Sequence, residues 1–195
     1  DLFDFVERDG LVYFCMGDVS GKGMNAALVM SKTHSLFRSL SRSTPTPAEL
    51  VAGINRELVE TSDNGMFVTA IIGTYNPENN QLLVCNAGHE PGLVTGSKGV
   101  DYVKPHLHPM GIMETATEQI AQSQIDLTNA RFFAYSDGLT ETEINGDPIG
   151  PENLSGMIVA HQSIGLPNQL DLVMQEVRQK ADRIFDDLTI LGIGK

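Results

Sequence analysis

The stretch that decides the fold is Leu11-Val-Tyr-Phe-Cys-Met-Gly-Asp18-Val-Ser-Gly-Lys-Gly23. Its first six residues are apolar and include β-branched and aromatic side chains, which predicts a buried strand. The glycines after that run predict a tight turn, and the alanine-, leucine- and methionine-rich residues 24–30 predict the start of a helix. A carboxylate on such a loop has little bulk around it. Asp18 is therefore a candidate ligand for a hard cation, which prefers oxygen.

Two other interpretations of this loop have to be compared with a cation site. A phosphate-binding P-loop needs four residues between its two glycines and Ser or Thr after its lysine. Here Gly17 and Gly21 enclose three residues. Lys22 is followed by Gly23, so the spacing excludes a P-loop. An ordinary strand-to-helix turn with a solvated Asp18 also fits, because glycine-rich turns are common.

Composition limits the class of protein. With 195 residues and 41% hydrophobic content, the chain is long enough for one domain with a substantial core. A net charge of −12 argues against nucleic acid as a partner, because its phosphates require a basic face. No apolar run approaches the roughly 20 residues that span a bilayer. Cys15 and Cys85 lie in apolar runs and are expected to be buried thiols rather than a disulfide.

The start of the sequence bears on domain organisation. Residues 1–4 contain neither a methionine nor a signal peptide. We expect residues 1–195 to form a single domain that is a C-terminal fragment of a larger regulated protein. A cytoplasmic location is expected, because free thiols suit a reducing compartment, while the parent protein could be attached to a membrane.

Hydrophobic periodicity predicts many hairpins and a few helices that do not alternate strictly with strands. Strands are expected over residues 1–6, 11–16, 66–75, 81–87, 92–94, 120–127, 131–135 and 188–193. Helices are expected after Gly23, from Thr46 with a capping box to Glu49, and over 151–160 and 166–181. Residues 97–113 are expected to be rich in loops. The combination indicates an α+β fold built on antiparallel sheets.

Aspartates stand beside turn or small residues at four separated places. They are Asp1 with Asp4, Asp18, Asp137, and Asp186 with Asp187. An all-oxygen ligand set suits Mg²⁺ or Mn²⁺, whereas Zn²⁺ prefers cysteine and histidine. Two such ions can share a water, lower its pKa and direct it at phosphorus. Spacing alone does not show that these aspartates converge, because Asp is also common in turns.

Five segments, in order along nearly the whole chain, resemble the SpoIIE/RsbU-type serine/threonine phosphatases. These enzymes are the bacterial branch of the metal-dependent type 2C protein phosphatase family. The segments are Gly17-Asp-Val-Ser-Gly-Lys-Gly23 with Ala26-Ala-Leu28, Phe67-Val-Thr-Ala70, Asn86-Ala-Gly-His-Glu-Pro91, Tyr135-Ser-Asp-Gly-Leu-Thr-Glu141 and Asp186-Asp-Leu-Thr189. Two departures stand out: the family's opening Gly-Gly-Asp pattern is reduced to Asp1, and residues 105–111 replace a shorter apolar run.

The resemblance implies a β-sandwich flanked by helices on both faces, with two Mn²⁺ or Mg²⁺ ions. Asp18 would bridge the ions together with the carbonyl of Val19, and Asp1 would help to hold one of them. Asp137 and Asp186 would hold the other. The catalytic residues would then be Asp18, Asp137 and Asp186, and a hydroxide between the ions would attack phosphoserine or phosphothreonine directly.

Other residues are candidates for supporting roles. Asp4 and Asp187 adjoin the expected ligands and could orient metal-bound water, and Gly138 adjoins Asp137. His89 could protonate the leaving oxygen, because imidazole titrates near neutral pH, or it could cap a turn by hydrogen bonding. The histidines of residues 105–111 are His106 and His108. They could bind metal, but histidines in loops more often face solvent.

The resemblance implies two partners. One is a phosphorylated protein similar to an anti-sigma-factor antagonist. The other is an upstream sensor domain that gates activity, often through formation of a homodimer.

Two rival functions are considered. A catalytically silent module that binds phosphoproteins predicts lost acidic ligands, yet Asp18, Asp137 and Asp186 are all present. A hydrolase of small phosphoesters predicts a deep basic pocket, yet the chain has no basic cluster. A metal-dependent serine/threonine protein phosphatase is therefore the predicted function.

Overall fold

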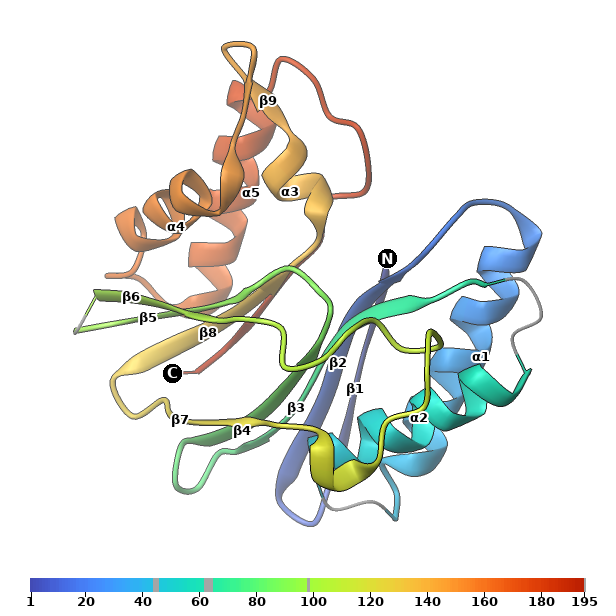
Figure 1. Cartoon of the computed structure of the whole chain (residues 1–195). Helices are drawn as coiled ribbons and strands as arrows, with labels where there is room; N and C mark the ends of the chain where they lie inside the picture. Colours follow the sequence, from blue (N-terminus) through green and yellow to red (C-terminus); the bar gives the residue numbers. More distant parts are fainter. Residues whose placement is uncertain (44–45, 62–64, 98, 195) are drawn as a thin grey trace. The chain divides into compact units, whose positions relative to one another are not determined.

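The structure is a computed structural model that describes residues 1–43, 46–61, 65–97 and 99–194. Its contacts divide the chain into two compact units. The first unit comprises Asp1–His89 and Lys104–Asp126, and the second comprises Glu90–Val103 and Leu127–Lys195. Figure 1 shows the elements of both units coloured along the sequence. Each unit has its own sheet and its own helices, so each is described by itself.

The first unit is built on a five-stranded antiparallel sheet in the order β1-β2-β3-β4-β7. Its strands are β1 (Leu2–Arg8), β2 (Leu11–Val19), β3 (Val68–Asn76), β4 (Gln81–Ala87) and β7 (Ser123–Asp126). Helices α1 (Met24–Leu40) and α2 (Pro47–Thr61) pack on this sheet, and the short 3₁₀-helix η1 covers Thr117–Gln119 (Figure 1). Phe37 and Ile54 of these helices share a core with Tyr13 and Cys15 of β2.

The second unit has a four-stranded antiparallel sheet in the order β11-β8-β5-β6. Its strands are β5 (Gly92–Gly96), β6 (Gly99–Val103), β8 (Ala130–Tyr135) and β11 (Ile190–Ile193). Its helices are α3 (Asp137–Glu141), α4 (Gly150–Ala160) and α5 (Leu166–Lys180), and a small hairpin joins β9 (Glu143–Ile144) to β10 (Asp147–Pro148). The helix expected over 166–181 is confirmed as α5, and its Val173 and Val177 are buried in a core with Phe133 and Tyr135 of β8.

The expected α+β class with antiparallel sheets is confirmed, and two local features of the structure follow from the residues at those positions. Asp9 and Gly10 both have positive φ, of 52° and 77°, as a two-residue hairpin between β1 and β2 requires. The capping box at the start of α2 is also present. The Thr46 N–H donates to the Glu49 carboxylate over 3.0 Å, and the Glu49 N–H donates to Thr46 Oγ1 over 3.3 Å.

Two expected elements are wrong in extent. Residues 97–113 contain β6, which pairs with β5 along its whole length, so they are less loop-rich than the sequence indicates. The strand expected over 120–127 is only Ser123–Asp126, because its N-terminal residue Ile120 closes η1 by donating its N–H to the Thr117 carbonyl over 3.0 Å. β6 forms a short hairpin with the neighbouring β5, whereas β7 pairs with β4, which lies far away in the sequence.

The states of the two cysteines and the lengths of the helices agree with what the composition predicts. Cys15 and Cys85 are free and buried, as predicted, and burial raises the pKa of the Cys85 thiol to about 12. Such thiols stay protonated at neutral pH and are poor nucleophiles. In the part of the chain that the structure describes, no helix is both long enough and apolar enough to cross a membrane.

Gly17 provides a test of how tightly β2 and β3 approach each other just before Asp18. A Cβ built on Gly17 would lie 2.2 Å from the backbone oxygen of Thr69 on β3, so one of the strands would have to move. We expect Gly17→Ala to lower the free energy of unfolding by about 1–3 kcal/mol in urea titrations. Gly156→Ala in α4 is the control. A Cβ there meets open space, so this variant should gain about 0.5–1 kcal/mol. Equal stability of the two variants would contradict the close approach.

Candidate active site

In the first unit, the strand register brings two of the predicted ligands together. Leu2 of β1 lies opposite Gly17 of β2, so continuing this register by one residue places Asp1 opposite Asp18. Tyr13, Cys15 and Val19 point into the core with α1 and α2, so the alternation of β2 turns Asp18 to the other face. Cross-strand neighbours share a face of the sheet. Asp1 and Asp18 therefore lie at the same end and on the same face of two adjacent strands.

The loop after Asp18 is held in place by Phe67, the residue directly before β3. The Ser20 N–H donates to the Phe67 carbonyl over 2.9 Å, and the Phe67 N–H donates back to Ser20 Oγ over 2.8 Å. Val19, whose carbonyl is a predicted ligand, lies between Asp18 and this reciprocal pair and is opposite Val68. The backbone that carries both predicted ligands is therefore fixed on both sides.

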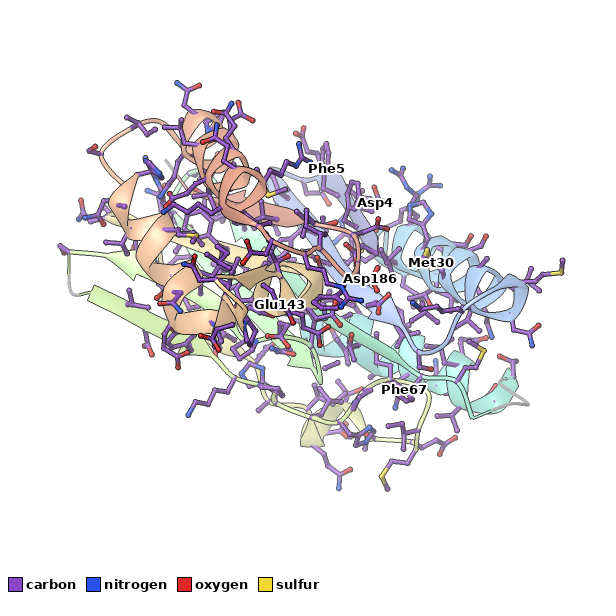
Figure 2. All side chains as sticks on the ribbon, turned by 90° about the horizontal axis from the view of Figure 1, so that it is seen from above. Asp4, Phe5, Met30, Phe67, Glu143 and Asp186 are labelled. Carbon is purple, nitrogen blue, oxygen red and sulfur yellow. The ribbon has the colours of Figure 1, made fainter. Side chains whose placement is uncertain are left out.

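Asp4 does not lie with Asp1 and Asp18. It is on the face of β1 that meets α1, where its carboxylate accepts two hydrogen bonds from Arg38, over 2.6 and 2.7 Å (Figure 2). His34 Nε2 lies 2.9 Å from the same carboxylate, whose side chain is only 8% exposed. The proposed role for Asp4 in orienting water beside Asp18 is therefore corrected. The reason is strand alternation: residues 1 and 4 point to opposite faces of β1.

His89 lies closer to Asp18 than the sequence indicates. Its Nδ1 is 3.0 Å from the hydroxyl of Thr69, the residue directly opposite Asp18 in the sheet. The turn that carries His89 is capped by Asn86, whose side chain accepts from the His89 N–H over 2.8 Å and donates to its carbonyl over 3.2 Å. Asn86 thus supplies the turn cap considered for His89. His89 is 6% exposed, and its ring is directed to Thr69 on β3, the strand that pairs with Asp18.

In the second unit, one buried hydroxyl joins the two other acidic segments. Ser136 Oγ donates to the Asp187 carbonyl over 2.9 Å and accepts from the Thr189 N–H over 3.1 Å. Gly138 is in direct contact with the same segment, because a Cβ there would lie 2.2 Å from the Asp187 carbonyl oxygen. The segment with Asp137 and the segment with Asp186 are therefore packed together, although 49 positions separate the two aspartates in the sequence.

Glu90 is a member of this acidic group to which the sequence assigned no role. Burial raises the pKa of Glu90, and the negative charges of Asp137 and Glu141 raise it further. Carboxylates that repel one another in this way are stabilised by a bound cation. The only sequence signal was its place in the segment Asn86–Pro91, directly after His89.

The chemistry of these residues fits a hard divalent cation. Asp18 and Asp137 are half-buried, and neither carboxylate makes a hydrogen bond or ion pair to any other residue in the described part of the chain. Asp186 accepts one local hydrogen bond, from the Asp187 N–H over 2.8 Å. Oxygen ligands without a basic partner are what Mg²⁺ and Mn²⁺ require. Over the described ranges, no three acidic, histidine or cysteine side chains already form a closed metal cluster.

His106 and His108 are engaged within the first unit. His106 Nδ1 accepts the Asn86 N–H over 3.0 Å, and its Nε2 is 2.9 Å from Ser123 Oγ. His108 Nδ1 lies 2.8 Å from the Pro109 carbonyl, and its Nε2 is 3.0 Å from Thr115 Oγ1. Since all four ring nitrogens have protein partners, these histidines fasten their loop rather than present ligands to a metal.

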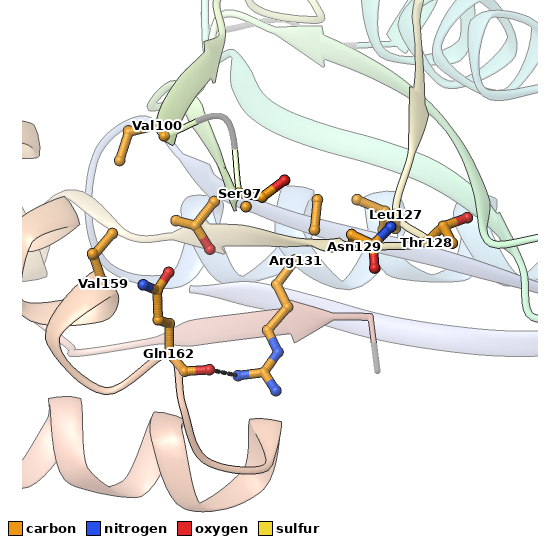
Figure 3. A pocket seen from close by; sticks show the side chains of 12 residues that line it. Ser97, Val100, Leu127, Thr128, Asn129, Arg131, Val159 and Gln162 are labelled. Carbon is orange, nitrogen blue, oxygen red and sulfur yellow. Dashed lines mark hydrogen bonds between the residues drawn. The ribbon is translucent and has the colours of Figure 1, made fainter.

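The second unit has a pocket of about 590 Å³, and none of its described lining residues is a predicted site residue. It is lined by the turn between β5 and β6, the start of β8 and the end of α4 (Figure 3). Arg131 donates there to the Gln162 carbonyl over 3.3 Å and to Gln169 Oε1 over 2.6 Å. None of its described lining residues carries a carboxylate, so these residues do not suit a divalent cation.

Comparison with known proteins agrees with these observations. The family model described as Stage II sporulation protein E (SpoIIE) matches residues 8–194. The chain belongs to the SpoIIE family. Among curated SpoIIE-type relatives, the phosphoserine phosphatase RsbU of Bacillus subtilis is 25% identical over 195 residues, which cover 98% of this chain and 58% of RsbU. The chain thus spans little more than half the length of this relative.

Solved structures establish the fold. The SiaA-PP2C domain of Pseudomonas aeruginosa superposes with a TM-score of 0.85 at 16% identity, covering 99% of this chain and 79% of that one. RsbX in complex with magnesium superposes with a TM-score of 0.68 at 18% identity, covering 97% of this chain and 84% of that one. The fold is therefore that of type 2C phosphatase domains, as the sequence predicted.

Ser136 provides a test of the contact between the two acidic segments. Ser136→Ala removes both hydrogen bonds of a buried hydroxyl, so we expect a loss of about 1–3 kcal/mol in the free energy of unfolding. Hydrogen exchange of the Thr189 amide should also become faster, because that amide loses an acceptor. Ser155→Ala in α4 is the matched control, since among the described residues its hydroxyl bonds just the Glu152 carbonyl of its own helix. Unchanged exchange at Thr189 would contradict the bridging role.

The buried ring of His106 makes the stability of the protein depend on pH, which can be tested. Burial lowers the pKa of His106 from its ordinary value of 6.5, so the folded state favours the neutral ring that accepts the Asn86 N–H. The stabilisation that comes from the neutral His106 ring is fully present above the pKa of His106 in the unfolded chain. It is lost as the pH falls through the lower pKa of His106 in the folded chain. We expect the free energy of unfolding to fall more between about pH 7 and about pH 5 in the wild type than in His106→Gln. Parallel pH profiles in urea unfolding would refute this.

Proposed function

We propose that this chain is a metal-dependent protein phosphatase that hydrolyses phosphoserine or phosphothreonine in a partner protein. The observation that carries the proposal is that two half-buried carboxylates, Asp18 near the end of β2 and Asp137 at the start of α3, have no protein partner among the described residues and adjoin the braced positions Ser20 and Ser136. Membership of the SpoIIE family and the description of RsbU as a phosphoserine phosphatase support it.

The proposed ligands of two Mn²⁺ or Mg²⁺ ions are Asp1, Asp18, the Val19 carbonyl, Asp137 and Asp186. RsbX has been solved with magnesium, which supports a divalent cation here. When bound, such ions supply Lewis acidity and lower the pKa of water for attack on phosphorus. The chain itself holds the acidic residues in position. Ser136 and Gly138 fix the Asp186 segment against Asp137, and the Ser20–Phe67 pair fixes the loop after Asp18.

His89 and Asp187 have supporting roles in this proposal. His89 is buried beside Thr69 and is proposed to deliver a proton to the leaving serine oxygen. Asp187 is held through its backbone carbonyl, which leaves its exposed carboxylate available to orient water. The proposed substrate is a phosphorylated protein of the anti-sigma-factor antagonist kind. Gating by a sensor domain, homodimer formation and a cytoplasmic location are also proposals.

The decisive experiment compares hydrolysis of an aryl phosphate and of a phosphoserine peptide with Mn²⁺, with Mg²⁺ and with chelator. We expect turnover that requires metal, and Asp18→Asn should lower it by more than the roughly 10- to 100-fold that follows loss of an outer-shell partner. Asp171→Asn on the exposed side of α5 changes the same charge and should leave turnover intact.

Two results would overturn this function. Turnover that persists in chelator would exclude the metal mechanism. Tight binding of a phosphorylated protein without turnover, in every metal, would favour the rival function of a silent binding module. Calorimetric titration of Mn²⁺ into wild type and Asp18→Asn separates a failure of metal binding from a failure of the chemical step.

A further inference from the structure

The loop between α5 and β11 is anchored along its first half. The Asp182 N–H donates to the Glu143 carbonyl over 2.9 Å, and the Glu143 N–H donates to the Arg183 carbonyl over 3.0 Å. The Gly146 N–H adds a bond of 3.2 Å to the Asp182 carboxylate. These bonds fasten the loop to the hairpin of β9 and β10, with Glu143 and Asp186 labelled in Figure 2. Its backbone conformation is therefore defined before it reaches Asp186.

The side chains of this loop nevertheless face outward. Ile184 is 46% exposed and Phe185 is 44% exposed, although both are large and apolar. The guanidinium of Arg183 stacks on the Phe185 ring, 4.4 Å from its centroid. Aromatic residues and arginine are enriched in protein interfaces, where they provide much of the binding energy. A braced loop that exposes all three side chains has the composition of an interface.

The charge of the loop is also informative. Arg183 is the only basic residue in 181–189, where it is accompanied by Asp182, Asp186 and Asp187. Yet within the described part of the chain its guanidinium forms no ion pair, and it lies on an aromatic face instead. An arginine held in this way keeps its hydrogen-bond donors available for a carboxylate of another molecule. The loop therefore presents one positive charge beside an apolar surface.

We propose that Arg183, Ile184 and Phe185 form a docking element for the peptide that flanks the phosphoserine of the substrate, which rests on the proposed function. An acidic side chain of the peptide pairs with Arg183, and an apolar side chain packs on Phe185 and Ile184. Three residues span at most about 10 Å, so these contacts fall within roughly three residues of a phosphoserine held at Asp186. The substrate class is thus a phosphoserine segment with acidic and apolar neighbours.

A charge-reversal experiment tests the docking element. Two phosphoserine peptides are compared that share a leucine next to the phosphoserine and differ only in carrying Glu or Lys within three residues of it. Each kcat/KM is divided by the rate of the same variant on an aryl phosphate. We expect wild type to prefer the Glu peptide about fivefold, the scale of one exposed ion pair, and Arg183→Glu to prefer the Lys peptide. Phe185→Ala should lower both peptide values about tenfold, mainly through KM.

Matched controls lie on the exposed side of α5. Arg178→Glu makes the same charge change and Leu172→Ala removes another exposed apolar side chain, and both should keep the wild-type ratio. An Arg183→Glu variant that retains the wild-type peptide preference would overturn the docking element while aryl phosphate turnover still supports the phosphatase. If wild type hydrolyses nothing, the Kd values of fluorescent peptides decide: the same reversal supports docking without catalysis, and equal Kd values reject it.

Discussion

The two hydrogen bonds of the Ser136 hydroxyl brace the segments of the second unit that carry Asp137 and Asp186. The hydroxyl joins the end of β8 to the segment before β11 through the Asp187 carbonyl and the Thr189 N–H. The absence of a side chain at Gly138 lets the start of α3 approach the same carbonyl. The pairing of β8 with β11 brings these strands together, and Ser136 and Gly138 extend the contact to the acidic residues before β11. Uncharged hydrogen bonds thus help to hold the two carboxylate-bearing segments together.

Strand alternation has the same importance in the first unit. Because Asp1 and Asp18 lie opposite each other on adjacent strands, their carboxylates share a face, while the residue two positions after Leu2, Asp4, belongs to the face that meets α1. There it is neutralised by Arg38 with His34 beside it. One short strand therefore carries a candidate ligand on one side and a structural ion pair on the other. Their roles differ because their neighbours differ.

Recognition of a protein substrate requires more than the acidic residues. The chain carries a charge of −12, so it offers little attraction for a phosphate in general. A single arginine stacked on an aromatic ring beside Asp186 would provide local attraction and an apolar contact together. This arrangement would separate the proposed chemistry of the carboxylates from the choice of peptide, which is proposed to depend on the exposed loop.

The sequence by itself determined the α+β class, most strands and helices, and the five segments that identify the family, because these depend on local periodicity and on turn residues such as Asp9-Gly10. It also named Asp18, Asp137 and Asp186. Only the tertiary structure separated Asp4 from Asp18, brought His89 to Thr69, added Glu90 to the acidic group and gave His106 and His108 protein partners. Most of these facts depend on strand register and on contacts between residues far apart in the chain, which a local pattern does not encode, whereas His108 bonds to the nearby Pro109 and Thr115.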